Sequence, residues 1–187
     1  MKRICVYAGS RPGKRPSYST AAQQLGEELV KRNLELVYGG ASVGLMGAVA
    51  DTVMSQGGKA IGIMPKGLFT QRHSGLTEFH NTESMHERKA MMAELSDGFI
   101  ALPGGFGSFE ELFEAITWSQ IGIHKKAVGL LNVEGFYDPL VRLVEHAIEE
   151  EFVPAESMGF IIVDADPASL LDKMAAFVPP TGKLVVE

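Results

Sequence analysis

The sequence has one cysteine, few cations and no long apolar segment, and each scarcity excludes a class of protein. A single cysteine, Cys5, allows no disulfide framework, so we expect a buried thiol in a protein of the reducing cytoplasm. Seventeen Lys and Arg against 23 Asp and Glu give a net charge of −6, which argues against a dedicated nucleic-acid binder. No run approaches the ~18 apolar residues of a membrane span, and the N-terminus lacks the apolar core of a signal peptide.

Several common site patterns are also missing. The histidines predict no metal site, because Ala90 stands where the second histidine of H-E-x-x-H would be needed. The glycine-rich stretch 38–47 is not a P-loop, since Leu45 and Met46 occupy the places of Lys and Ser/Thr. The chain has no G-x-S-x-G nucleophile elbow, and its first turn does not supply G-x-G-x-x-G. We therefore expect no metal and no cofactor.

The chain does contain a regular alternation of short apolar runs and amphipathic segments. Its 187 residues, of which 45% are hydrophobic, predict one compact domain over residues 1–187. The alternation predicts a doubly wound parallel sheet with helices on both faces, a Rossmann-like α/β fold. Strands are expected at 3–8, 34–38, 60–64, 76–81, 97–102, 126–131 and 160–163, and helices at 19–33, 44–55, 84–95, 112–120, 137–150 and 167–177.

The most informative segment is Pro103-Gly-Gly-Phe-Gly-Ser-Phe-Glu-Glu111, which links a predicted strand to a predicted helix. Its three glycines present bare backbone N–H groups at the positive end of a helix dipole, which suits a phosphate or another anion. We expect Glu111 in the first helical turn, where the dipole keeps its carboxylate ionised as a base or a cation stabiliser. Two more glycine turns, at 9–10 and 39–40, also follow predicted strands and should reach the same sheet edge.

The two glutamates near predicted helix starts, Glu87 and Glu111, also have a purely structural interpretation. The spacing Ser-x-x-Glu, ending at Glu87 and again at Glu111, is that of a capping box. We interpret Glu87 as structural. For Glu111 the two interpretations make opposite demands, because a capping glutamate folds back on its own backbone and a catalytic one points into the cleft. Glu110 and Glu114 remain alternatives.

Arg88 is the second candidate for chemistry. Met85, Arg88, Lys89 and Met92 fall on one face of a predicted helix, and a solvated face would be more uniformly polar. A guanidinium offers planar, bidentate contacts to phosphate or carboxylate. The mixture of charged and apolar side chains therefore favours a functional Arg88.

Taken together, these motifs resemble the LOG family of cytokinin-activating nucleotide phosphoribohydrolases, some of which have carried the misleading label lysine decarboxylase. The family signature P-G-G-x-G-T-x-x-E is matched at 103–111, with Ser108 in place of threonine. A second motif, M-H-x-R-K-A, is matched at 85–90. The segments 7–10 and 38–47 also match, and the resemblance spans about residues 3–175. Three separated motifs in the right order make it specific.

The resemblance implies a function and a set of site residues. Members of the family hydrolyse the N-glycosidic bond of an N6-substituted adenosine 5′-monophosphate, releasing the free base and ribose 5-phosphate. Carried over to this sequence, Arg88 and Glu111 are the implied catalytic pair. The implied nucleotide-binding residues are Ser10, Gly39, Gly40, Met85, Lys89, Gly104, Gly105, Gly107 and Ser108. The resemblance also implies a homodimer with its site near the interface.

Two other functions compete with this one. A non-catalytic nucleotide-binding or carrier protein would use the same glycine cradle. Arg88 together with Glu111 favours the enzyme, because a pure binder has little use for an anion beside a phosphate site. A pyridoxal-phosphate decarboxylase needs a Schiff-base lysine beside an acidic partner, and Lys89 lacks such a sequence context.

Overall fold

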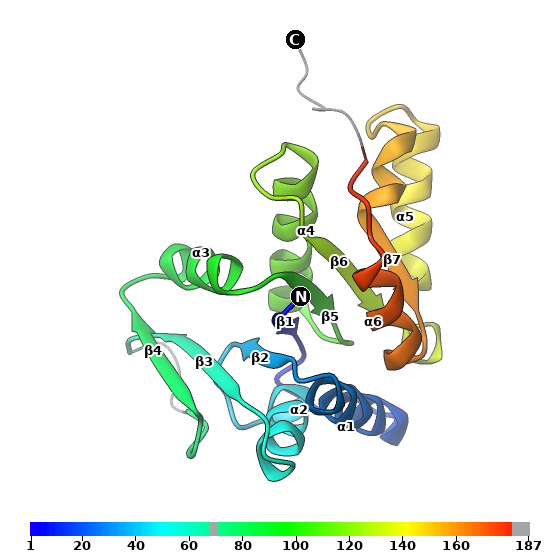
Figure 1. Cartoon of the computed structure of the whole chain (residues 1–187). Helices are drawn as coiled ribbons and strands as arrows, with labels where there is room; N and C mark the ends of the chain where they lie inside the picture. The colour runs from blue at the N-terminus through cyan, green and yellow to red at the C-terminus, as the bar shows by residue number, and fades with distance from the viewer. Residues whose placement is uncertain (68–70, 181–187) are drawn as a thin grey trace.

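The computed structural model, which describes residues 1–67 and 71–180, contains a seven-stranded parallel sheet (Figure 1). The strand order is β4-β3-β2-β1-β5-β6-β7, and it confirms the predicted Rossmann-like α/β fold. The strands are β1 Arg3–Tyr7, β2 Glu35–Tyr38, β3 Ala60–Pro65, β4 Glu78–Thr82, β5 Gly98–Ala101, β6 Ala127–Leu131 and β7 Ile161–Asp164. The helices are α1 Pro16–Lys31, α2 Gly44–Ser55, α3 Met85–Leu95, α4 Phe106–Gln120, α5 Asp138–Glu149 and α6 Pro167–Ala175, with short 3-10 turns at Val133–Gly135 and Ala155–Phe160.

The position of β1 at the centre of the sheet decides where a ligand can bind. Ile4 pairs with Leu36 of β2 on one side and with Gly98 of β5 on the other. The strand order therefore reverses between β1 and β5. In open parallel sheets, ligands bind outside the carboxyl ends of the strands at such a reversal.

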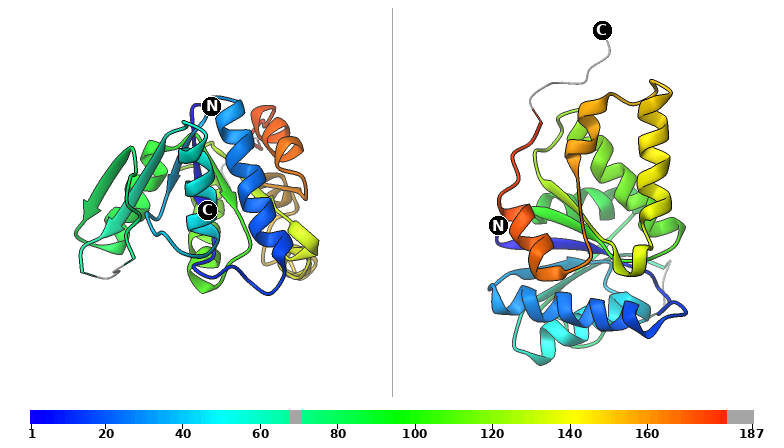
Figure 2. Two further views of the ribbon diagram at one scale, coloured as in Figure 1. Left: turned by 90° about the horizontal axis from the view of Figure 1, so that it is seen from below. Right: turned by 90° about the vertical axis from the view of Figure 1, so that its right-hand side faces the viewer.

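Helices cover both faces of the sheet, and each face has its own core (Figures 1 and 2). On one face, α1, α2 and α6 bury side chains such as Leu25, Val49 and Leu170. On the other, α3 and α4 bury Met92 and Leu112. This double coverage explains why β2, β3, β5 and β6 have no exposed residue and read as continuous apolar runs.

Two helices begin earlier than predicted, and both shifts have local causes. Helix α1 begins at Pro16 instead of residue 19, because the fixed φ of proline suits the first helical position. Helix α4 begins at Phe106 instead of residue 112, with Gly105 as its N-cap. Glycine is unfavourable inside a helix but is tolerated in its first turn, so Gly107 does not prevent α4 from beginning at Phe106.

The burial of Cys5 and the length of the helices bear on two further predictions. Cys5 lies fully buried in β1, as predicted. Within residues 1–67 and 71–180, none of the helices combines the length and the apolar character that crossing a bilayer requires.

Candidate active site

The glycine turns after β1 and β5 meet at the reversal between these strands, and the glycine-rich segment after β2 joins them through Leu45. The amide of Gly9 donates to the carbonyl of Pro103 at 3.0 Å, which joins the turn after β1 to the turn after β5. The amide of Leu45 donates to the carbonyl of Gly9 at 2.9 Å, which adds the segment after β2. Segments far apart in the sequence thus form one wall, as the sequence predicted.

The glycines of this wall fall into two groups. Gly44 has φ +60, and a Cβ there would collide with the backbone of Ser10 and Arg11, so this position needs glycine for packing. A Cβ on Gly105 or Gly107 would meet no protein atom within 4 Å. Gly105 and Gly107 therefore leave open space next to the start of α4. They are not needed for close packing within the protein.

The start of α4 presents free amides to that space. The first α-helical hydrogen bond runs from the amide of Phe109 to the carbonyl of Gly105 at 3.0 Å, so the amides at 106–108 precede it and have no helical partner. Gly105 has no side chain that could cap them. Together with the helix dipole, these amides form a site suited to an anion.

Helix α3 brings Arg88 to the same place. Ser84 caps the helix, accepting from the amide of Glu87 at 3.1 Å, and the Glu87 carboxylate accepts from the amide of Glu83 at 2.7 Å. The predicted structural role of Glu87 is therefore confirmed. Arg88 follows one residue later on the buried face of α3, where its Nε donates to the carbonyl of Ile63 at 3.1 Å.

The second candidate, Glu111, is paired directly with Arg88. Nη1 of Arg88 donates to Oε1 of Glu111 at 2.6 Å, and the two residues are only 7% and 9% exposed. Glu111 therefore does not fold back as a helix cap, and the capping interpretation of this residue is wrong. Because α4 starts at Phe106, Glu111 lies in its second turn, not in the first.

The surroundings of Glu111 shift its pKa in two opposing directions. Burial raises the pKa of Glu111 above its usual range, while the charge of Arg88 and its hydrogen bond oppose that rise. The sequence predicts an ionised Glu111, and in the structure burial opposes that state while Arg88 supports it. A carboxylate with a raised pKa is a better proton acceptor near neutral pH than an exposed one.

Lys89 occupies a different environment from Arg88. Its Nζ donates to Glu114 at 3.0 Å and also to Glu110, so it makes a second ion-paired link between α3 and α4. Burial alone would lower the pKa of Lys89, but these two hydrogen bonds raise it, so the side chain remains a cation. The structure thus places Lys89 against carboxylates instead of beside the open amides.

Two adjoining pockets lie at this edge of the sheet. The first, which we call the acid pocket, has a volume of about 250 Å³ and contains both candidate catalytic side chains. Its lining residues are Ala8, Gly9, Ser10, Met46, Met85, Arg88, Gly105, Phe106, Gly107, Ser108, Glu110 and Glu111. The second, the aromatic pocket, has a volume of about 560 Å³ and is lined by Gly9, Ser10, Arg11, Pro12, Gly13, Tyr18, Leu45, Pro103, Gly104, Gly105, Phe106 and Phe136.

Most residues predicted for the site therefore come together, and a few do not. Gly104 lies in the aromatic pocket, and Gly39 touches Arg88 from outside the acid pocket, since a Cβ there would collide with Nη2. Gly40 and Lys89 line neither pocket. Sequence reasoning missed Met46 and Phe106 as lining residues, although both stand inside the glycine-rich segments that it singled out.

Fold and site together define a doubly wound α/β protein that has an acid–guanidinium pair beside an anion cradle. Over 95% of its length the chain is 49% identical to the cytokinin riboside 5′-monophosphate phosphoribohydrolase LOG of Oryza sativa subsp. japonica, covering 74% of that protein. It is 48% identical over 98% of its length to LOG1 of Arabidopsis thaliana, covering 87% of that protein. The chain belongs to the LOG family of phosphoribohydrolases.

Two further comparisons concern the family model and the fold. The model of the family described as "Possible lysine decarboxylase" matches residues 46–174. A molybdenum cofactor binding protein from Rippkaea orientalis superposes with a TM-score of 0.71 at 22% identity, over 94% of this chain and 97% of that one. At this identity the likeness concerns the fold alone.

Gly39 offers a test of the Arg88–Glu111 geometry. Because a Cβ at this position would strike the end of the Arg88 side chain, Gly39→Ala should displace the guanidinium and reduce turnover by at least about tenfold while the protein stays folded. Gly98→Ala is the control. Its Cβ would contact the methyl group of Met174 at 3.1 Å, in the core on the face of the sheet that α6 covers, away from Arg88. Equal activity of the two variants in a nucleotide hydrolysis assay would contradict the prediction.

Proposed function

We propose that this chain hydrolyses the N-glycosidic bond of adenosine 5′-monophosphate and its N6-substituted derivatives, releasing the free base and ribose 5-phosphate. The observation that carries the proposal is the buried pair of Arg88 and Glu111 in the pocket that the α4 amides also line. The identity of about half of all residues to named phosphoribohydrolases supports it. We assign Arg88 and Glu111 as catalytic residues and Ser10, Met85, Gly105, Gly107 and Ser108 as substrate contacts.

The chemistry needs an anion next to the sugar. Cleavage of a ribosyl–base bond passes through an oxocarbenium-like transition state with positive charge on the sugar. Glu111 can stabilise that charge and accept a proton from the attacking water. The amides at 106–108 would hold the phosphate and so fix the reacting carbon near the carboxylate.

Arg88 has a supporting role in this mechanism. A guanidinium does not lose its proton in proteins, so Arg88 cannot protonate the departing base. It contacts Oε1 of Glu111 and the carbonyl of Ile63, and it thereby fixes the direction of the carboxylate. No other hydrogen bond to this carboxylate is found within residues 1–67 and 71–180, which leaves Oε2 available to the substrate.

The decarboxylase description of the family model does not fit these residues. A Schiff-base lysine must reach the pocket and lose its proton. Lys89 lies outside the lining of both pockets and is held charged by Glu110 and Glu114. We therefore treat Lys89 as a structural cation that joins α3 to α4.

We also propose a homodimer of single-domain subunits in the cytoplasm. Helix α5 stands at the periphery (Figure 2, right) and has no buried residue, although it carries a row of apolar side chains. Leu143 of α5 is 60% exposed and Phe113 of α4 is 38% exposed, and both line a hollow of about 390 Å³ between the two helices. A second copy of the chain would cover this apolar surface.

The cytoplasmic location is supported by the single cysteine, which excludes an internal disulfide.

The proposed reaction can be tested with adenosine 5′-monophosphate and chromatographic detection of adenine. The wild-type protein should release adenine, and Glu111→Gln should lose at least about 100-fold in turnover, or about 2.7 kcal/mol. Glu114→Gln is the matched control, because this carboxylate is on the same helix but outside the acid pocket. Adenine release no faster than that of a heat-killed sample would favour a nucleotide carrier instead.

The acid limb of the pH–rate profile should depend on Arg88. Glu111 acts ionised, so kcat/KM should fall as the pH drops through its raised pKa. Arg88 lowers that pKa, and Arg88→Met should therefore move the acid limb to higher pH as well as slow the reaction. Arg88→Lys, which keeps the positive charge, should move the limb less. An unmoved limb in Arg88→Met would remove Glu111 as the titrating group.

The dimer can be tested by sedimentation. Leu143→Arg places a charge on the exposed apolar surface of α5 and should convert a wild-type dimer into monomers. Glu145→Arg introduces the same side chain two residues further along, on a different side of the helix, and should leave the dimer intact. A monomeric wild-type protein, or a dimeric Leu143→Arg variant, would contradict the proposed interface.

A further inference from the structure

The segment 71–73, which precedes β4, pairs with the turn 40–42 that follows β2. The amide of His73 donates to the carbonyl of Gly40 at 2.9 Å, and an antiparallel β-bridge joins the next pair of residues. At the far end of the pairing a second backbone hydrogen bond, of 3.0 Å, runs back from the turn to the segment. We call this pairing the turn clamp. It holds the backbone directly after Gly39.

The turn clamp matters because Gly39 touches the guanidinium of Arg88. A Cβ on Gly39 would overlap Nη2 of Arg88, so the backbone of the turn is in contact with the side chain that pairs with Glu111. Neither Gly39 nor Gly40 lines either pocket, so the turn has no surface for the substrate. Its influence on the reaction therefore passes through the position of Arg88.

The side chain of His73 fastens the turn clamp to α2. Its Nε2 lies 3.0 Å from Oδ1 of Asp51 on α2, and its Nδ1 lies 2.6 Å from the carbonyl oxygen of Ser74. The residue is only 7% exposed. Because the turn 40–42 leads almost directly into α2, the contact between His73 and Asp51 closes a ring that runs from the turn through the helix and back to the turn.

Both partners of the His73 ring are hydrogen-bond acceptors. A carbonyl oxygen and a carboxylate only accept, so both ring nitrogens must carry hydrogen for both bonds to form, and only the imidazolium meets that condition. In the neutral ring one nitrogen lone pair faces an oxygen. The Asp51 side chain is 70% exposed and can turn to water, so the link to α2 is the one that is lost. Histidine loses its proton between about pH 5 and 8, which makes this link dependent on pH.

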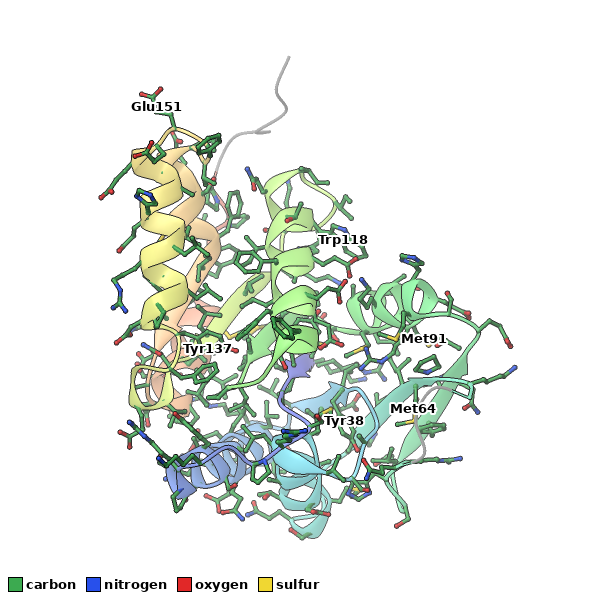
Figure 3. All side chains as sticks on the ribbon, turned by 180° about the vertical axis from the view of Figure 1, so that it is seen from behind. Tyr38, Met64, Met91, Trp118, Tyr137 and Glu151 are labelled. Carbon is green, nitrogen blue, oxygen red and sulfur yellow. The ribbon has the colours of Figure 1, made fainter. Side chains whose placement is uncertain are left out.

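Two other ionisable side chains belong to the same cluster. Arg72 directs its guanidinium onto the ring of Phe79, 3.7 Å from the ring centroid. Tyr38, which can be followed in Figure 3, is fully buried, and its hydroxyl has no hydrogen-bond partner among the described residues. Burial and the charge of Asp51 raise the pKa of Tyr38, so its phenol stays neutral. The charge that His73 matches is therefore that of Asp51.

We propose that His73 is a positioning residue whose protonated side chain holds the turn at Gly39 against Arg88 and so keeps Arg88 aligned with Glu111. This inference rests on the proposed function, because that function makes Arg88 and Glu111 the catalytic pair. When His73 gives up its proton to solvent, Asp51 becomes hydrated and α2 no longer holds the turn clamp. The backbone beside Arg88 then gains freedom, and kcat falls.

The test compares wild-type protein with Asp51→Asn, with adenosine 5′-monophosphate as substrate, at about pH 6 and about pH 9, on either side of the range in which histidine titrates. The asparagine amide accepts from a protonated Nε2 and donates to a neutral one, so the variant keeps the link at both pH values. The two proteins should have equal kcat at the lower pH, and Asp51→Asn should be at least about threefold faster at the higher pH. KM should agree within about twofold, because the turn lines neither pocket.

His73→Gln tests the same link from its other side. The glutamine amide can donate to Asp51 but does not titrate, so the ratio of its kcat to that of the wild type should rise at least about threefold between about pH 6 and about pH 9. A purely structural role of His73 would lower kcat by the same factor at both pH values. His146→Gln, the identical change at an exposed histidine of α5, is the control and should show a constant ratio.

The other outcomes overturn the inference or pass the decision to a second measurement. A constant ratio in either folded variant removes His73 as a proton-linked positioning residue and leaves nucleotide hydrolysis intact. If thermal melting shows that His73→Gln does not fold, Asp51→Asn decides, since its side chain is exposed. If the wild type cleaves no nucleotide, the proposed function fails, and the NMR resonance of the Arg88 Nε–H decides the inference. That resonance should differ between wild type and Asp51→Asn at the higher pH only, and coincidence at both pH values overturns the inference.

Discussion

The buried contact between Arg88 and Glu111 is the interaction on which the rest of this site depends. Removing two charges from water is costly, and a buried ion pair commonly adds little net stability. Its value here is geometric, because one guanidinium reaches both the interior of β3, through the carbonyl of Ile63, and a carboxylate on α4. Without that contact, burial would drive Glu111 towards its neutral form, and the pocket would lose the anion that glycoside cleavage requires.

The topology of the sheet supplies everything that surrounds this pair. Strand β1 lies at the centre, so the turns after β1 and β5 are neighbours although they are far apart in the sequence. Helix α4 follows β5 at once and points its free amides into the space between them, while α3 presents Arg88 from the side. The site thus combines a general property of doubly wound sheets with a particular ion pair placed across it.

The sequence predicted the architecture and most of the lining but not the pairing within the site. Alternating apolar runs and helices were sufficient for the fold, and the bounds of α2 agree with the structure at both ends, because strand and helix periodicities are local signals. For Glu111 the local spacing indicated a helix cap, whereas its partner Arg88 is 23 residues away in the sequence. Likewise Lys89 looked equivalent to Arg88 on the same face of α3, and only the carboxylates of α4 separate their roles. Such contacts depend on how α3 and α4 dock against each other. The spacing of residues within each helix carries no information about that docking.

The hydrogen bond between Gly9 and Pro103 has a consequence for how the protein is made. These two residues belong to segments that leave the ribosome at widely separated times, and each provides one side of the same cleft. A nascent chain that has completed β1 to β4 therefore has no cavity to fill and cannot act on cellular nucleotides. Catalytic competence arrives only when β5 and α4 have docked, because α4 carries Glu111, so a chain that ends before α4 is inert instead of partially active.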